Sequence, residues 1–150
     1  MEMDFKCKAF DQLSSKELFA IYQERVAVFV VEQECAYQEV DPDDLKAYHL
    51  FSRDNQGEIV AYARLIPTDD ETARLGRVLV NKKYRQQGHA TELVTEAIKQ
   101  TKFLFPKSAT LAIQAQYYLR AFYASFGAQI VSEPYLEDNI KHVDMTLKLK

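Results

Sequence analysis

Hydrophobic and polar positions alternate near the start of the chain and then change to a helical period. Residues 5–10 follow the two-residue alternation that predicts a half-buried strand. Ser14 and Glu17 have the spacing of a capping box, and the apolar residues after them recur near the 3.6-residue period. These patterns predict a strand over residues 5–10 and a helix from about residue 15 to residue 31.

An acidic segment follows this helix. Residues 32–44 contain six carboxylates and no basic side chain, namely Glu32, Glu34, Glu39, Asp41, Asp43 and Asp44. Pro42 would interrupt a helix here, so we expect an acidic loop. A solvated face is the usual role of such a run, although beside a reactive site it would attract a cationic amine.

The rest of the chain predicts a sheet with helical crossovers. Residues 49–51 and 59–66 flank a turn-forming sequence at 54–57, which predicts a β-hairpin. Further strands are expected over 75–80, 109–113, 130–131 and 143–149, and helices over about 90–98 and over 119–126, the second ended by Gly127. The helix between the strands at 75–80 and 109–113 predicts a βαβ unit with two parallel strands. Without a repeat or linker, we expect one domain over residues 1–150.

Composition narrows the class of protein. The chain has 150 residues, of which 47% are apolar and 27% charged, and its net charge of −3 disfavours nucleic-acid binding. Two cysteines, no signal peptide and no long apolar run predict a cytoplasmic protein without a membrane span. The scattered residues His49, His89 and His142 match no zinc-binding spacing, so we expect no metal.

One strand-to-helix junction has the features of an anion site. The strand at 78–80 leads through a polar stretch into a helix that begins near Gly88. A helix start leaves backbone N–H groups unpaired, and Lys82, Lys83 and Arg85 add positive charge to a chain that is acidic overall. This favours a phosphate or pyrophosphate ligand, although a glycine at such a turn is as often a plain helix entry. The glycines fit neither a P-loop nor a dinucleotide fingerprint.

The same junction resembles a known signature. Arg85-Gln86-Gln87-Gly88-His89-Ala90 is similar to the Arg/Gln-x-x-Gly-x-Gly/Ala signature of the GNAT superfamily of N-acetyltransferases. Residues 122–128 resemble the Phe-Tyr-x-x-x-Gly-Phe segment of that family, with Ala128 in place of the usual aromatic. The likeness extends over nearly the whole chain to the ElaA-type subfamily, through residues 29–33, 37–39, 76–78 and 133–138.

This resemblance implies a fold and a co-substrate. The fold would be α/β, with a mixed, mainly antiparallel central sheet flanked by helices and a parallel, splayed strand pair at the cofactor site. The co-substrate would be acetyl-coenzyme A. The residues expected to hold it are Val78, Leu79 and Val80, whose strand would supply oxyanion donors, and Arg85, Gln86, Gln87, Gly88, His89, Ala90 and Thr91 around the pyrophosphate.

The resemblance also indicates catalytic residues. Tyr123 occupies the general-acid position of the family and would protonate the leaving thiolate, since a phenol with a pKa of about 10 is protonated at neutral pH. A tyrosine on the apolar face of a helix is otherwise usually a core residue. The carboxylate that many relatives carry before the pyrophosphate loop falls at Arg74 here, and neither Arg74 nor Arg77 can accept a proton. The remaining candidate bases are Glu32, Glu39, Glu133, His142 and a water relay.

These observations predict an enzyme that transfers an acetyl group to a primary amine of a small molecule or peptide, by direct attack in a ternary complex. A non-catalytic coenzyme A-binding or sensing module is the alternative, and a domain whose acidic segment docks a basic protein is a third interpretation. The acceptor stays open, because Arg77 would suit a carboxylate whereas the acidic segment would suit a polyamine or lysine. The family also allows a homodimer.

Overall fold

The computed structural model describes residues 3–150, whose strands form a single eight-stranded sheet. The order across the sheet is β1-β2-β3-β4-β5-β8-β6, and β7 also pairs with β8. The strands are β1 (Lys6–Ala9), β2 (Tyr48–Arg53), β3 (Ile59–Pro67), β4 (Thr72–Val80), β5 (Thr110–Gln116), β6 (Gln129–Ile130), β7 (Tyr135–Glu137) and β8 (Ile140–Lys148).

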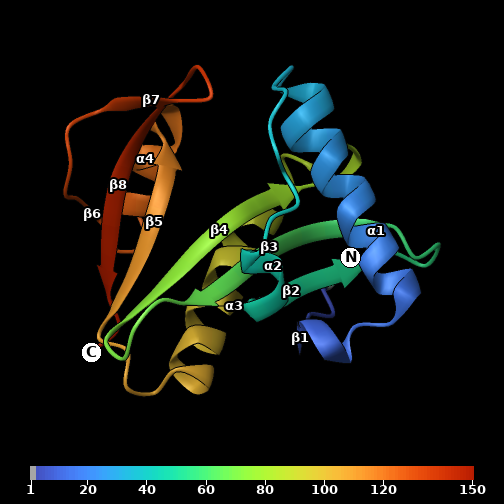
Figure 1. The fold of residues 1–150 in the computed structure, drawn as a ribbon, viewed down its shortest axis with the longest axis horizontal. Helices are drawn as coiled ribbons and strands as arrows, with labels where there is room; N and C mark the ends of the chain where they lie inside the picture. The colour runs from blue at the N-terminus through green and yellow to red at the C-terminus, as the bar shows by residue number, and fades with distance from the viewer. Residues whose placement is uncertain (1–2) are drawn as a thin grey trace.

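The strands β4 and β5 form the parallel pair, and they stay together for only part of their length. Their pairing runs from Thr72 opposite Thr110 to Leu75 opposite Ile113. Beyond that point β4 and β5 no longer pair with each other, although β4 stays paired with β3 and β5 with β8. The sheet therefore divides into two arms that diverge from a common base near the C-terminus (Figure 1). The expected mixed, mainly antiparallel sheet with a splayed parallel pair is therefore confirmed.

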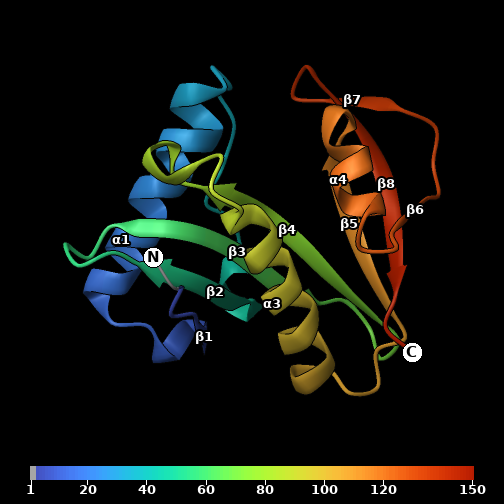
Figure 2. The ribbon, with the colours of Figure 1, turned by 180° about the vertical axis from the view of Figure 1, so that it is seen from behind.

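The larger arm of the sheet is formed by β1, β2, β3 and β4, and the smaller arm by β5, β6, β7 and β8. Helices cover both faces of the larger arm. The helix α1 (Ser15–Val26) and the short α2 (Asp43–Lys46) lie on one face, and α3 (His89–Leu104) crosses the other as it links β4 to β5. The helix α4 (Arg120–Ala124) covers the smaller arm (Figure 2). A π-helix, η2 (Ala27–Glu32), continues α1, and the 3-10 turns are η1 (Phe10–Gln12), η3 (Lys82–Tyr84) and η4 (Tyr117–Leu119).

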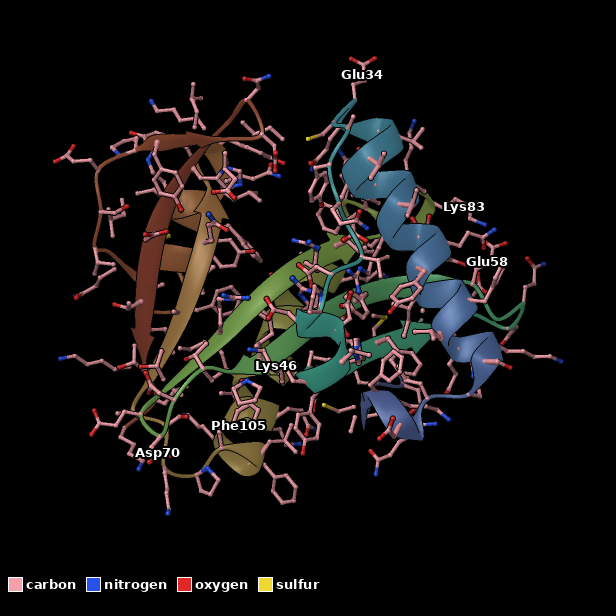
Figure 3. All side chains as sticks on the ribbon, in the orientation of Figure 1. Glu34, Lys46, Glu58, Asp70, Lys83 and Phe105 are labelled. Carbon is pink, nitrogen blue, oxygen red and sulfur yellow. The ribbon has the colours of Figure 1, made fainter. Side chains whose placement is uncertain are left out.

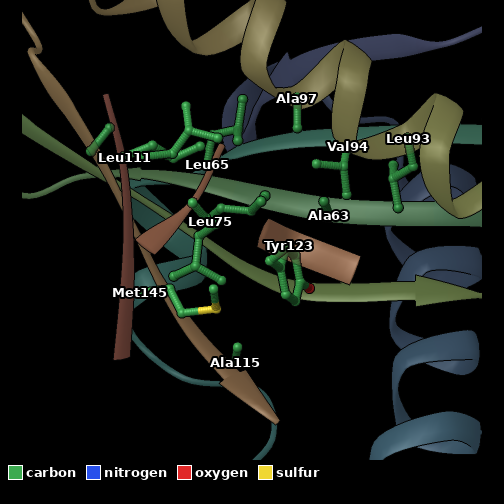
Figure 4. Packing of buried hydrophobic residues seen from close by; sticks show 14 of the residues in the cluster. Ala63, Leu65, Leu75, Leu93, Val94, Ala97, Leu111, Ala115, Tyr123 and Met145 are labelled. Carbon is green, nitrogen blue, oxygen red and sulfur yellow. The ribbon is translucent and has the colours of Figure 1, made fainter. Parts of the chain in front are cut away.

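Two apolar clusters fix β3 and β4 between α1 and α3. Leu93, Val94 and Ala97 of α3 pack in one cluster with Leu75 of β4 (Figure 4). Ile21 of α1 packs in the other, on the opposite face, with residues that include Phe51, Tyr62 and Leu79. Burial of one such side chain contributes about 1.5–3 kcal/mol. The packing on both faces therefore holds β4 in a fixed position in the sheet.

Several predicted elements have different bounds in the structure. The capping box is confirmed, since Ser14 Oγ accepts from the amide of Glu17 and Glu17 Oε1 accepts from the amide of Ser14. The helix then widens to a π-helix after Val26. The acidic segment is not only a loop as predicted, because Pro42 caps the one-turn helix α2 and does not prevent it. The strands β4 and β8 begin three residues earlier than predicted, and β7 was not predicted.

Candidate active site

A cleft of about 700 Å³ opens where β4 and β5 separate. One wall is formed by the outer half of β4 and by the end of η2 with the residues that follow it. The other wall is formed by β5, α4 and the turn between β7 and β8. Because the arms join only at their base, the cleft is bordered by main chain that lacks a neighbouring strand.

The β4 wall contains a β-bulge. Tyr62 of β3 pairs with Leu79, whereas Arg64 pairs with Gly76, so two residues of β4 stand opposite one of β3. Arg77 lies in this bulge with φ of +51°. After the bulge, the amide of Asn81 donates to Val60 at 2.8 Å.

Strand alternation then gives the direction of the neighbouring main-chain groups. The main-chain N–H of Asn81 points toward β3, so by alternation the main-chain groups of Leu79 also point toward β3. The N–H and C=O groups of Val78 and Val80 then point the other way, toward the gap. The position of the Val80 carbonyl agrees, because it accepts from Arg85 Nε at 2.9 Å. The main chain of Val78 is therefore available to a ligand in the cleft.

The loop that precedes α3 forms a second set of free amides. Gln86 and Gly88 have φ of +63° and +83°, and amides around left-handed residues turn to one side and form a nest for an anion. Within residues 3–150, the amides of Gln86, Gln87 and Gly88 donate to no protein acceptor. The amides of the first turn of α3, beginning at His89, add to them. Residues 86–91 thus combine a nest with a helix N-terminus, which suits linked phosphates.

Side chains around this loop are placed differently from one another. Gln86, Gln87, Gly88 and Thr91 are exposed and Ala90 is half-buried. The side chain of His89 is buried, with Nδ1 3.0 Å from Glu92 Oε1, so His89 can contribute its amide but not its ring.

Arg85 and Glu32 lie side by side in a two-point ion pair. Arg85 Nη1 and Nη2 donate to the two oxygens of Glu32 at 2.7 and 2.8 Å. These hydrogen bonds hold the pKa of Glu32 below its ordinary value of 4.5. Glu32 is therefore a poor proton acceptor in this arrangement. Its contact with Arg85 connects the end of η2 to the loop of free amides at residues 85–88, which we call the anion loop.

Tyr123 projects from α4 into the core beside the cleft. It is only 5% exposed, belongs to the cluster that contains Leu75 and Met145, and also lines the cleft (Figure 4). Burial raises the pKa of its phenol, so the hydroxyl keeps its proton at any physiological pH. Tyr123 therefore presents a protonated hydroxyl beside the cleft.

His142 of β8 lies on the other side of the cleft from β4. Its Nδ1 is 2.7 Å from the carbonyl of Ile140, and its ring stacks on Tyr135 with centroids 6.2 Å apart. A carbonyl can only accept, so Nδ1 carries the proton and Nε2 of the neutral ring has a free lone pair. His142 can therefore accept a proton.

The carboxylates of the acidic segment mostly pair with arginines that lie far apart in the sequence, from Arg25 to Arg85. Glu39 and Asp44 are 3% and 1% exposed, so the predicted solvated face is wrong for both. The pairs are Arg25 with Glu39 and Asp44, Arg64 with Asp41 and Asp44, Arg74 with Asp43, and Arg77 with Glu39 and Asp41. Glu34 lies exposed at the tip of the segment (Figure 3).

This ion-pair network was missed by sequence reasoning, although one signal was present. Arg25 follows Ile21 by four residues, and both are 0% exposed, so a charged residue stands in the apolar stripe of α1. A buried arginine requires carboxylate partners, and the acidic segment is the obvious source of them.

Two other expectations concern absences. In residues 3–150, no cluster of three or more His, Cys, Asp or Glu side chains is placed to hold a metal ion. The described helices include none that is long and apolar enough to cross a membrane. The cytoplasmic location and the homodimer stay predictions.

The two cysteines lie in different surroundings. Cys7 is half-buried, which raises the pKa of its thiol to about 11, and Cys35 lines the cleft.

The splayed parallel pair and the free amides before α3 are the features that the resemblance to the GNAT superfamily implies, and the comparisons with known proteins agree. Residues 14–149 match the family model described as an acetyltransferase (GNAT) domain, so the chain belongs to the GNAT family. Within that family it is of the ElaA type. It is 39% identical to ElaA of Escherichia coli over 138 residues, 89% of each chain.

Further similarities extend over almost the full chain. A UPF0039 protein of Schizosaccharomyces pombe is 46% identical over 147 residues, 98% of each chain. The crystal structure of E. coli ElaA has a TM-score of 0.90 at 36% identity, covering 97% of this chain and 99% of that one. An acyl-CoA N-acyltransferase from Pseudomonas aeruginosa has a TM-score of 0.91 at 38% identity with the same coverage. Family membership supports acyl transfer from coenzyme A.

Proposed function

We propose that the protein transfers an acetyl group from acetyl-coenzyme A to a primary amine, by direct attack in a ternary complex. The observation that carries this proposal is the separation of β4 from β5 after Leu75, together with the bulge that turns the main chain of Val78 toward the gap. The cleft is large enough for two substrates to meet beside that main chain.

The residues present fit coenzyme A. The nest and helix start at residues 86–91 would take its pyrophosphate through main-chain amides. Its extended arm would lie along Val78 and Val80, where the main-chain groups of Val78 and the amide of Val80 would bind it as they would bind a further strand. The guanidinium of Arg85 already pairs with Glu32, so Arg85 would hold the anion loop in place rather than bind the pyrophosphate with its side chain.

Two side chains can handle the protons of the reaction. An amine with a pKa of about 10.4 must lose a proton at a cost of roughly 4.6 kcal/mol at pH 7 before it can attack. We assign His142 Nε2 as the acceptor of that proton, directly or through water, because its lone pair is free while Glu32 and Glu39 are held by arginines. The amide of Val78 would donate to the oxygen on which charge develops. Tyr123 would donate its proton to the sulfur that leaves.

The acceptor entrance favours a cationic amine. From the sequence, Arg77 would suit an acceptor with a carboxylate and the acidic segment would suit a polyamine or lysine. Neither feature decides the acceptor, because Arg77 pairs with Glu39 and Asp41 of the acidic segment. Glu137 and Asp138, at the turn between β7 and β8, line the cleft and have no Lys or Arg partner within residues 3–150. Glu137 accepts only from the neutral amide of Gln114, at 2.8 Å. Their negative charge would attract an ammonium group.

Amine-dependent release of coenzyme A thiol tests the function. A panel of small amines, diamines and peptides should give release with at least one member, with cationic amines preferred. Tyr123→Phe should lower kcat about a hundredfold while calorimetry shows unchanged coenzyme A affinity. Tyr48→Phe is the matched control, since Tyr48 packs against Phe105 away from the cleft.

The outcomes separate three interpretations. If Tyr123→Phe turns over like the parent, Tyr123 is only a packing residue and the acid assignment fails. If the parent binds coenzyme A but releases no thiol with any amine, the protein is a non-catalytic binding module. If calorimetry detects no coenzyme A binding at all, the anion loop has been misinterpreted.

A further inference from the structure

The bulge of β4 contains a residue in an unfavourable conformation. Arg77 has φ of +51°, a region that residues with a side chain seldom occupy. A residue stays in such a conformation only where its surroundings determine it, and residues of this kind cluster at functional sites. The main chain that follows Arg77 is that of Val78, which points into the cleft. What holds Arg77 therefore also determines the direction of the Val78 amide.

The side chain of Arg77 is held from several directions. Its Nε donates to Glu39 Oε2, and its Nη2 donates to the main-chain carbonyl of Glu39 at 2.9 Å. Its guanidinium also lies over the ring of Tyr37, 5.4 Å from the centroid. These contacts occupy Nε and Nη2, whereas Nη1 has no hydrogen-bond partner within residues 3–150 and Arg77 also lines the cleft. Whether Arg77 also touches a substrate is therefore decided by experiment.

Glu39 is in turn anchored from the interior. Arg25 Nε lies 3.1 Å from both oxygens of the Glu39 carboxylate, and Arg25 Nη2 donates to the Glu39 carbonyl at 3.0 Å. Arg25 is completely buried on α1 and is fixed further by Asp44. One buried carboxylate thus joins two guanidinium groups, and the contacts form a continuous chain from α1 to the bulge of β4.

We propose that the Arg25–Glu39–Arg77 chain positions the main chain of Val78 for acyl transfer, with Arg77 as a positioning residue that does not touch the acceptor. This inference rests on the proposed function, because Val78 matters only if charge develops on an oxygen beside it.

Two substitutions at one position test the proposal. Arg77→Ala removes the side-chain contacts and leaves a residue that disfavours positive φ, so the bulge should relax and kcat should fall about tenfold to a hundredfold. Arg77→Gly removes the same contacts but tolerates φ of +51°, so kcat should recover severalfold relative to alanine. If Arg77 positions Val78 without touching either substrate, the KM values for acetyl-coenzyme A and for the amine should change by less than about threefold in both variants.

Arg53→Ala is a matched control. Arg53 also lies at a register shift, between β2 and β3, and also pairs with a carboxylate, that of Glu17, but it is remote from the cleft. Its substitution should leave kcat within about twofold of the parent. Thermal unfolding of all variants shows whether each one is folded.

A second measurement keeps this inference distinct from the proposed function. The amide resonance of Val78 in a ¹⁵N spectrum should shift in Arg77→Ala and return toward the parent position in Arg77→Gly. That pattern supports the positioning role even if no amine is acetylated, in which case only the proposed function fails. Equal losses in the alanine and glycine variants with a raised amine KM would show that Arg77 binds the acceptor. An unmoved Val78 resonance, or unchanged kcat in both variants, would likewise overturn the proposal.

Discussion

At the scale of single residues, the ion-pair network gives the clearest prediction for stability. Asp44 is 1% exposed and receives hydrogen bonds from Arg25 and Arg64. Asp44→Asn would leave these buried guanidinium groups short of a counter-charge and should lower the free energy of unfolding by about 3–5 kcal/mol. Asp43→Asn, which removes a partly exposed partner of Lys46 and Arg74, should cost less than about 1 kcal/mol. Urea unfolding of both variants measures the difference, and equal losses would contradict the assignment.

The same network predicts how stability depends on pH. Burial raises the pKa of Asp44, but hydrogen bonds from Arg25 outweigh burial and leave the pKa below its ordinary 3.8. The unfolded chain therefore takes up protons first, and this contribution, complete above about pH 4, is lost as pH falls through the lower native pKa. Burial also lowers the pKa of His49, so stability should already decline below about pH 6.5. Urea midpoints between pH 7 and pH 3 should fall in both ranges.

His142 gives a prediction for the rate. His142→Gln removes the free lone pair, so kcat should fall about a hundredfold at pH 7. The loss should shrink toward pH 10, because the amine then supplies its own neutral form. A pH–rate profile of the same shape and height as that of the parent would instead favour a water relay without His142.

At the scale of elements, sequence patterns were sufficient wherever a local rule decides the structure. The capping box at Ser14, the hairpin at 54–57 and the crossover helix before β5 were all predicted. The burial of Glu39 and Asp44 was not, because their partners come from α1, β3 and β4 and only the folded sheet brings them together. The strand β7 was missed for a similar reason, since three residues acquire their strand character from β8.

The start of α3 gives the prediction at this scale. Gly88 and Gly57 both have φ of +83°, and a Cβ at either would meet nothing within 4 Å. Substitution by alanine should therefore cost each site about 1–2 kcal/mol of stability through backbone strain alone. Only Gly88→Ala should also weaken coenzyme A binding, by about tenfold, because Gly88 belongs to the anion nest whereas Gly57 lies in the hairpin turn. Calorimetry on both variants decides, and an equal effect on binding would argue against the nest.

At the scale of the whole molecule, the two arms of the sheet are joined at β4 and β5 by four residue pairs, from Thr72 opposite Thr110 to Leu75 opposite Ile113. A ligand that fills the gap beyond Leu75 would link the arms again. Coenzyme A at a hundred times its Kd should then raise the free energy of unfolding by about 2.7 kcal/mol. The predicted family resemblance reached this scale because its two motifs belong to different arms, residues 85–90 at the start of α3 and residues 122–128 at the end of α4.

Hydrogen exchange can show where that linkage occurs. With coenzyme A, amides should gain protection at residues 86–91 and at Val78 and Val80, which face the gap. ADP, which has the pyrophosphate but no pantetheine arm, should protect residues 86–91 alone, because nothing in it reaches along β4. Amides of β1 and β2 should be unchanged by either ligand, since they lie at the far edge of the sheet. Protection of Val78 by ADP, or none there with coenzyme A, would mean that the arm does not follow the splayed strands and that the cleft is used differently.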